Sequence, residues 1–354
     1  MTDGTTPPPD APEPLTPPAA ISAEGAVVSA PATAPAVPAA PARAVWATLT
    51  PEAPWCPEEW RAHLDDLAPG LIDKATAAAA HEATGSLLRA DGWTLVLSAR
   101  RGRLHAHRGE HREDAGHLLH FEQGWCAAVA DGAGSAPYSR IGSALATYTV
   151  SHTLREALLH GRAAREALGP ALQHAAQRTH ECLRAFCTRT GLAPRELRTT
   201  LLVAAVHQGM LGVMQVGDGA MAFRHHDGTL THPHAAATGD YSGEVAHFLP
   251  DDGALEQLLV SLSQRPVNDV QTVLLATDGV EDPWYPFTRY AGALIDTLLI
   301  GITDDTALPP ALTPARTASV LQATDPGQAL AEWLTFEKRG ENDDRTLCVV
   351  HATR

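Results

Sequence analysis

Three strand-like apolar runs in this chain end in the dipeptide Asp-Gly, and this pattern limits how the chain can fold. The dipeptides begin at Asp131, Asp218 and Asp278. A fourth acidic cluster, residues 342–344, stands instead directly before a strand-like run at 345–350. In an antiparallel sheet the start of one strand lies beside the end of its neighbour. We therefore expect the four clusters to meet at one edge and to place several carboxylates in one cleft.

Carboxylates gathered in this way are ligands for hard cations such as Mg²⁺ or Mn²⁺. Two such ions with a bridging water form a site that hydrolyses phosphoesters. Asp-Gly is also a common hairpin turn, so each instance has a purely structural alternative. We interpret Asp227 as a turn residue, and Asp91 and Asp252 as loop residues, because they lack the long apolar approach of the other three.

The composition argues against several classes of protein. The formal net charge of −15 argues against binding to nucleic acid or to an anionic membrane surface. No apolar stretch reaches the length of a membrane span, and the N-terminus lacks the pattern of a secretory signal. Five irregularly spaced cysteines fit reduced thiols, and we expect a cytoplasmic location. Zinc bound by Cys182, Cys187 and His180 is the alternative, although their spacing matches no common zinc pattern.

The composition also divides the chain into three parts. Residues 1–44 are almost entirely Pro, Ala, Thr and small polar residues, which is typical of a disordered tail or tether. A Pro-rich ligand for a partner is the alternative interpretation of this part. Residues 45–91 contain a helix start and an Ala-rich run, and we expect a helical extension packed on the main domain. Residues 92–354 form the expected main domain.

Within the main domain, strands are expected in meanders and helices in pairs. The expected strands are 93–99, 124–130, 199–207, 209–216, 220–225, 270–277 and 346–351. The expected helices are 139–160, 163–188, 289–300, 316–322 and 326–338. Because the two kinds of element do not alternate one by one, the pattern favours an α+β fold of stacked sheets flanked by helices over a doubly wound parallel sheet.

Two polar segments are expected near the acidic cleft. Residues 105–114 are interpreted as a polar loop, although their alternating histidines leave a transition-metal site as an alternative. Residues 238–255 contain glycines, including Gly239 and Gly243, and several acids, and are expected to form a second loop.

Short motifs follow one another in a fixed order along the chain. They are Gly102-x-x-His105, Arg112-Glu113-Asp114-Ala115, Val129 to Ser135, Thr199-Thr200-Leu201, Val216-Gly217-Asp218-Gly219, Thr277-Asp278-Gly279-Val280 and Asp343 to Leu347. In order and spacing this series resembles the metal-dependent protein phosphatases of type 2C, in their bacterial branch. The resemblance implies that residues 92–354 are a type 2C phosphatase-like catalytic domain, a four-layer αββα sandwich with two metal ions in a cleft at one end.

The resemblance also implies which residues hold the first ion. Asp131 would bridge both ions, and the backbone carbonyl of Gly132 would be a further ligand. Asp278 and Asp343 would bind the first ion.

A second group of residues would act around the other ions. Asp114, with Glu113, would act at the second ion, largely through water. Asp218 matches the position that holds a third, weaker ion in some members. Asp344 stands where many members have Asn, and we therefore rank it below Asp343.

Two features depart from the family pattern. Many members carry an Arg shortly before the Glu-Asp pair to hold the phosphate, and here Arg108 and Gly109 occupy that neighbourhood. Ala133 replaces a His that follows the bridging Asp-Gly in some members and is a candidate general acid there. His105 and Arg108 are the candidates for these catalytic roles in this chain.

The resemblance predicts a phosphatase that hydrolyses phosphoserine and phosphothreonine in proteins through a metal-bridging water. Besides the phosphoprotein substrate, a cognate serine/threonine kinase is the partner that the family suggests. Two alternatives stay open. One is a catalytically weak module on the same fold that binds phosphoproteins or acts as a sensor, and the other is a hydrolase of small phosphoesters.

Overall fold

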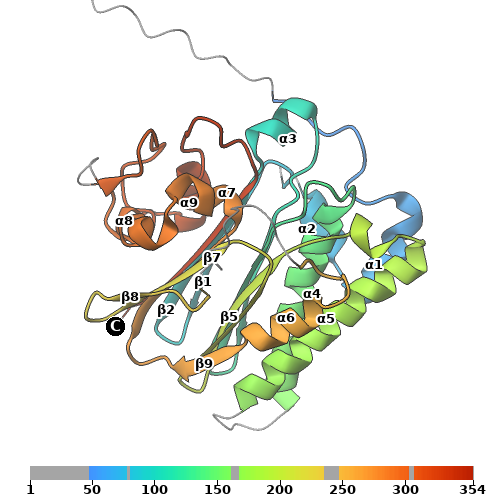
Figure 1. Ribbon diagram of the computed structural model, residues 1–354, viewed down its shortest axis with the longest axis horizontal. Coiled ribbons are helices and arrows are strands. Elements are labelled where there is room, and N and C mark those ends of the chain that lie inside the picture. The colour runs from blue at the N-terminus through green and yellow to red at the C-terminus, as the bar shows by residue number, and fades with distance from the viewer. Residues whose placement is uncertain (1–47, 78–79, 161–166, 235–246, 303–306, 354) are drawn as a thin grey trace, which may run out of the picture. The chain divides into compact units, whose positions relative to one another are not determined.

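The computed structural model describes residues 48–77, 80–160, 167–234, 247–302 and 307–353, which contain two antiparallel sheets (Figure 1). One sheet has six strands, in spatial order β1 (Ala83–Ala90), β2 (Trp93–Arg100), β11 (Arg345–Ala352), β10 (Val270–Ala276), β7 (Ala220–His225) and β8 (Leu230–Thr231). The other has five, in the order β3 (Ala115–Phe121), β4 (Gly124–Ala130), β5 (Leu201–His207), β6 (Met210–Val216) and β9 (Ser263–Pro266).

Helices cover the outer face of each sheet, as Figure 1 shows. The five-stranded sheet is covered by α4 (Ser139–His160), α5 (Leu168–Thr190) and α6 (Ala254–Ser261). The six-stranded sheet is covered by α7 (Asp278–Glu281), α8 (Phe287–Leu299) and α9 (Pro326–Trp333). The fold is therefore the expected α+β sandwich, with four layers in the order αββα.

Smaller elements complete the described structure. They are α1 (Arg61–Leu67), α2 (Leu71–Thr76) and α3 (Arg103–Arg108), with short 3-10 helices at Glu58–Trp60, Pro194–Glu196 and Asp282–Trp284. Among the described residues, no helix has the length and apolar character that spanning a membrane requires.

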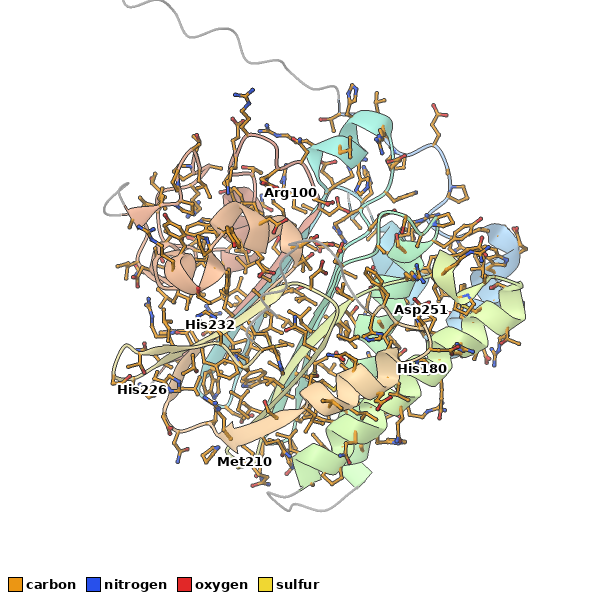
Figure 2. All side chains as sticks on the ribbon, in the orientation of Figure 1. Arg100, His180, Met210, His226, His232 and Asp251 are labelled. Atoms are coloured by element: carbon orange, nitrogen blue, oxygen red, sulfur yellow. The ribbon has the colours of Figure 1, made fainter. Side chains whose placement is uncertain are left out.

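The layer order explains why the central strands are apolar without interruption. Strand β4 is buried along its whole length because one face meets the other sheet and the opposite face meets α4. Trp125 of β4 is fully buried, and its ring centroid lies 5.8 Å from that of Trp93 in the opposite sheet. Side chains fill the space between the ribbons in Figure 2. A strand covered on both faces shows no polar alternation, so its end is marked only by the polar residue that follows.

The N-terminal part of the described chain contains both helices and a strand. Trp60 lies against Tyr138, directly before α4, and against Phe186 of α5, with ring centroids 4.6 Å and 6.1 Å away. The helical extension expected at residues 45–91 contains α1 and α2, but residues 83–90 form β1, which pairs with β2 along its whole length. The boundary expected at residue 92 falls inside this hairpin. Residues 1–44 lie outside the described residues.

Other expectations for single elements were wrong. Residues 316–322 form no helix, because their backbone bonds to the end of α8 instead, with Val320 N donating to Leu298 O. The segment expected as a polar loop at 105–114 begins with the helical residues of α3. Half of the loop expected at 238–255, residues 238–246, lies outside the described residues. Residues 247–253 belong to no helix or named strand, and the last two residues belong to α6.

The turn and cysteine expectations can also be compared with the structure. Asp227 sits in the β7–β8 turn, as expected, where its Oδ1 accepts a hydrogen bond from Thr229 N at 2.9 Å. All five cysteines are buried and none forms a disulfide. The sulfur of Cys182 accepts a hydrogen bond from the Thr149 hydroxyl, and the described residues bring no metal-binding group together around it.

Candidate metal centre

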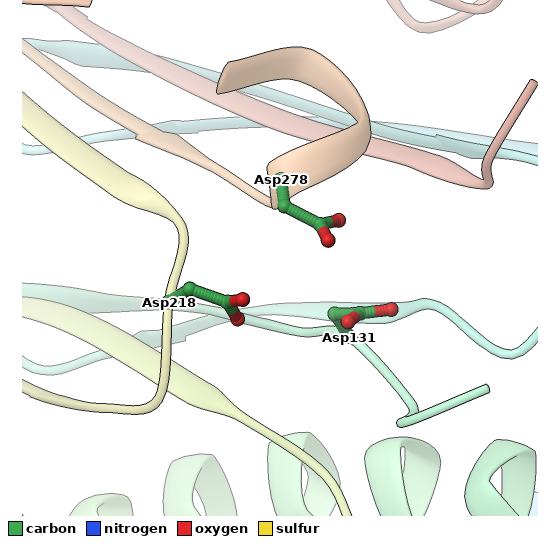
Figure 3. Close-up of side chains that lie close together, drawn as sticks. All are labelled: Asp131, Asp218 and Asp278. Carbon is green, nitrogen blue, oxygen red and sulfur yellow. The ribbon is translucent and has the colours of Figure 1, made fainter. Parts of the chain in front are cut away.

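Three carboxylates from distant parts of the sequence meet at one end of the sandwich. Asp131, Asp218 and Asp278 each place a carboxylate oxygen within 4.8 Å of the other two. Asp131 follows β4, Asp218 lies between β6 and β7, and Asp278 follows β10. Figure 3 shows their carboxylates extending from three separate segments of the chain toward one space. Three of the four clusters expected to converge therefore meet, and they come from both sheets rather than from the edge of one.

Two threonines before β5 fix the backbone of Asp131. Asp131 N donates to the Thr200 hydroxyl at 2.9 Å, and Thr200 N donates to Asp131 O at 2.8 Å. The Thr199 hydroxyl also donates to Asp131 O, at 2.8 Å. These bonds explain the Thr-Thr motif: it continues the β4–β5 pairing for one further residue and holds the Asp131 side chain at a defined position.

Gly132 occupies a position with no room for a side chain. A Cβ atom there would lie 2.8 Å from both Glu113 O and the Ser139 Cβ. The residue therefore lets the chain turn from β4 toward α4 while passing directly beside Glu113.

Asp114 links the two sheets behind Asp131. It precedes β3, and its side chain is almost completely buried. Its Oδ2 accepts a hydrogen bond from the Thr277 hydroxyl at 2.8 Å, and the same hydroxyl accepts a bond from Thr346 N at 2.9 Å. Burial raises the pKa of Asp114 to about 7, against the lowering effect of nearby hydrogen-bonding groups, including Asp131.

Asp344, which sequence reasoning ranked below Asp343, organises one side of the site. Its Oδ1 accepts a hydrogen bond from Gly102 N and its Oδ2 one from Glu113 N, both at 2.6 Å. The side chain is fully buried, so both backbone donors would lose their partner if it were removed. The carboxylate thereby joins the start of β11, the start of α3 and the Glu-Asp pair.

The charge of Asp343 acts on all three converging carboxylates. Its charge raises the pKa of Asp131, Asp278 and Asp218. Its Oδ1 accepts a hydrogen bond from Asp344 N at 2.8 Å, which orients the side chain at the end of its loop.

Like charges and burial make this acidic cluster unfavourable without a cation. Burial, followed by the charges of Asp343 and Asp114, raises the pKa of Asp278 to about 9. Burial, followed by the charges of Asp114 and Asp278, raises the pKa of Asp131 well above its usual value. Buried oxygens that lack a hydrogen-bond partner within the described chain are Glu113 Oε2, Asp114 Oδ1, Asp218 Oδ1 and Asp278 Oδ1. A set of unpartnered, hard oxygen donors fits a divalent cation such as Mg²⁺ or Mn²⁺.

Sequence reasoning missed an acidic flank beside Asp218. Glu281 is one helical turn after Asp278, and burial, then the charges of Asp282 and Asp218, raise its pKa to about 7. Burial also raises the pKa of Asp282, against the nearby charge of Lys338. The available signal was the i, i+3 spacing of Asp278 and Glu281, which places both on one face of a helix.

A family model for protein phosphatase 2C matches residues 101–335 of the sequence. The chain belongs to the protein phosphatase 2C family. Among solved structures, the serine/threonine phosphatase of S. agalactiae is 12% identical, with a TM-score of 0.51 over 76% of this chain and 99% of that chain. The serine-threonine phosphatase 2C of Toxoplasma gondii is 13% identical, with a TM-score of 0.48 over 76% of this chain and 98% of that chain. A comparison with curated protein sequences found no match.

His105 and Arg108, the two candidates for the catalytic roles at the phosphate, occupy different environments in this phosphatase 2C fold. Arg108 ends α3, and its exposed guanidinium lies 3.8 Å from Glu110. None of its ion pairs within the described chain involves the acidic cluster. His105, one turn earlier, is largely buried, with Nδ1 3.0 Å from Asp344 Oδ1 and Nε2 3.9 Å from Glu113 Oε2.

The environment of His105 keeps its imidazole positively charged. Burial disfavours the charged form, but the paired Asp344 and the charges of Glu113 and Asp343 outweigh it and raise the pKa of His105 to about 9. Arg112, which directly precedes the Glu-Asp pair, is bound to backbone carbonyls: its Nε donates to Asp114 O, and Nη1 to Ala80 O and Ala99 O. Of the two candidates on α3, His105 is therefore the one whose positive charge lies beside the acidic residues Asp344 and Glu113.

Proposed function

We propose that this chain is a metal-dependent phosphatase that hydrolyses phosphoserine and phosphothreonine in proteins. The observation that supports it most directly is the convergence of Asp131, Asp218 and Asp278 within 4.8 Å, in a member of the protein phosphatase 2C family. Burial and the neighbouring carboxylates raise their pKa values, and a bound cation would offset the repulsion that contributes to this.

The chain offers two groups of oxygen donors for metal ions. Asp131, Asp278 and Asp343 would hold one ion, with the Gly132 carbonyl as a further donor. Asp131 would extend to a second ion, at which Asp114 and Glu113 act, and Asp218 would serve a third. When bound, such ions activate a water molecule for attack on phosphorus and neutralise charge on the phosphoryl oxygens.

His105 is the residue we assign to the substrate phosphate. Its imidazolium lies at the rim of the acidic group and is held by Asp344 at 3.0 Å. A fixed cation there offsets the repulsion between the substrate's phosphate and the surrounding carboxylates. Its Nε2, 3.9 Å from Glu113 Oε2, can also supply a proton to the departing serine or threonine oxygen.

The test is release of phosphate from a mixed pool of phosphoserine and phosphothreonine peptides with Mn²⁺. We expect activity that requires the ion and that falls at least about a hundredfold in Asp131→Asn and Asp278→Asn. The matched control is Asp227→Asn, because Asp227 lies in an exposed turn and Asn can accept the same turn hydrogen bond. A folded wild type that is inactive with saturating Mn²⁺ contradicts the proposal.

A second candidate function is a module that binds phosphoproteins without hydrolysing them. The observation that favours it is the outward position of Arg108, which stands in the sequence neighbourhood where many family members carry their phosphate-binding arginine. Calorimetric titration with Mn²⁺ separates the two functions. Tight binding of Mn²⁺ together with hydrolysis supports the phosphatase, whereas phosphopeptide binding without turnover supports the module.

A further inference from the structure

A cavity of about 520 Å³ opens between the edge strands of the two sheets. Strand β1 is the edge of the six-stranded sheet and β3 the edge of the five-stranded sheet, and both line it. Helices α2 and α4 contribute further walls, together with Trp55, Leu97 of β2 and loop residues 80–81, 111–112 and 114. The volume lies within the range of small-molecule sites in proteins. The converging carboxylates of the metal centre, Asp131, Asp218 and Asp278, are not among its lining residues.

The cavity stays unfilled because many of its lining side chains are small and the position of strand β1 is fixed. Six alanines line it: Ala75, Ala77, Ala80, Ala83, Ala115 and Ala144. The opposite face of β1 is fixed by α9, where a Cβ atom on Gly85 would lie 2.7 Å from the backbone of Gly327. Strand β1 therefore has a fixed position against α9, and the alanines are too short to fill the space beside it.

The polar part of the wall carries positive charge. Lys74 lines the cavity and forms no ion pair with any described residue, its ammonium lying 5.8 Å from the centre of the Tyr148 ring. Arg140 also lines it and donates from Nε to Trp55 O at 2.8 Å. The acid in the wall is Asp114, whose Oδ2 already accepts the Thr277 hydroxyl. In a chain with a net charge of −15, this local excess of cations favours an anion.

Two histidines add polar groups to the same wall. His111 Nδ1 and His117 Nδ1 are buried and lack hydrogen-bond partners within the described chain. Burial lowers the pKa of His117 to about 3, so its ring is uncharged at neutral pH. His111 Nε2 lies 2.8 Å from Ala53 O, which fixes the orientation of that ring.

Apolar side chains form the rest of the lining. They include Trp55, Leu71, Leu97 and Leu118. We propose that this cavity is a second ligand site, which binds an amphiphilic organic anion: a molecule with an apolar body and a single carboxylate or sulfonate. The anionic group lies by Lys74 and Arg140, and the apolar body lies between β1, β3 and α4. The cavity lies beside the metal centre and shares Asp114 with it, but the test requires neither a metal ion nor a phosphopeptide.

The probe is 1-anilinonaphthalene-8-sulfonate, titrated into the full chain without metal ions and followed by fluorescence and calorimetry. We expect saturable binding of one molecule per chain. Replacing the unpaired cation in Lys74→Glu is expected to weaken binding by about tenfold or more, because a charge-assisted contact becomes a repulsion. Arg178→Glu is the matched control, since it makes the same change of charge on α5 outside the cavity. Absence of saturable binding, or equal weakening in both variants, overturns the proposal.

A second variant tests the location without changing the charge. Ala77 is exposed at the end of α2 and lines the cavity, so Ala77→Trp narrows it without disturbing the buried core. We expect loss of probe binding with an unchanged melting temperature and near-ultraviolet circular dichroism. Displacement of the probe by decanoate indicates an aliphatic ligand and displacement by 2-naphthoate an aromatic one. If Ala77→Trp binds the probe like the wild type, or if neither carboxylate displaces it, the proposed site is wrong.

Discussion

His105 Nδ1 lies 3.0 Å from Asp344 Oδ1, although α3 and the start of β11 lie far apart in the sequence, near the two ends of the two-sheet domain. The same carboxylate accepts hydrogen bonds from Gly102 N and Glu113 N. One buried side chain therefore sets the position of the imidazole, the start of its helix and the Glu-Asp pair. This makes Asp344 a positioning residue of the site.

Asp344→Asn is expected to lower the pKa of His105 from about 9 toward its ordinary value of 6.5 in the metal-free protein. The reason is that the amide keeps a hydrogen-bond acceptor but loses the charge that favours the imidazolium. Titration of the His105 ring signals by nuclear magnetic resonance measures this change, with Asp227→Asn as the control. A pKa that stays near 9 in Asp344→Asn would show that other charges hold the proton.

The stability of the metal-free protein is expected to fall as the pH rises from 6 to 9. Asp114 and Asp278 have ordinary pKa values of 3.8, and folding raises them to about 7 and about 9. Their protonated forms stabilise the fold fully below 3.8, and this contribution is lost as the pH rises through the two folded values. The His105 pair changes in the same direction, since its stabilisation is lost as the pH passes about 9. Melting temperatures measured across this range, with and without saturating Mn²⁺, check the prediction, and the ion is expected to reduce the decline.

Asp278→Asn is expected to stabilise the metal-free protein at pH 8 by on the order of 2 kcal/mol. The folded pKa of Asp278 is about 9, so its carboxylate must take up a proton on folding at this pH, whereas the neutral amide need not. The same variant should lose most of the stabilisation that Mn²⁺ gives the wild type, which would be about 2.7 kcal/mol at a hundredfold excess over the dissociation constant. Urea unfolding with and without Mn²⁺ measures both effects. Equal Mn²⁺ stabilisation of variant and wild type would exclude Asp278 as a ligand.

Gly279→Ala is expected to destabilise the protein by about 3 kcal/mol or more, because its Cβ would overlap Asp344 O in the backbone. Gly134→Ala is the matched control in the same site, since its nearest neighbour would be Glu113 Oε2 at 3.9 Å. We expect this control to change the unfolding free energy by less than about 0.5 kcal/mol. Similar losses in the two variants would show that the tight packing around Gly279 adapts.

The sequence predicted the central strands well because burial on both faces makes them continuously apolar. Strands β4 and β7 and helix α4 have the expected bounds, and the carboxylates after β4, β6 and β10 meet as expected. Strand β1 was missed because it is an edge strand with an exposed middle, where Gly85, Ser86 and Leu87 give no apolar alternation. Its place in the sheet depends on pairing with β2 and on contact with α9, which are not local in the sequence.

Within the site, the sequence indicated which carboxylates converge but not how they are held. The role of Asp344 depends on backbone donors from two other segments, and nothing in its own neighbourhood reveals them. Arg108 and His105 are both cations on one short helix, and only the folded direction of α3 separates the exposed residue from the buried one. The prediction of a helix at 316–322 was wrong because a contact distant in the sequence decides the structure there. Gly301 and Ala318 form a β-bridge that replaces local helical hydrogen bonds.

The cleft carboxylates belong to different sheets: Asp131 extends from the five-stranded sheet, Asp278 from the six-stranded sheet, and Asp218 from the turn that crosses between them. An ion shared by these side chains would cross-link the two sheets and resist sliding of one over the other. The affinity for the ion would then depend on the distance between the sheets. Trp93 and Trp125 contact each other between the sheets. A substitution at either residue that changes this packing would therefore alter the affinity for the ion, although neither residue is a ligand.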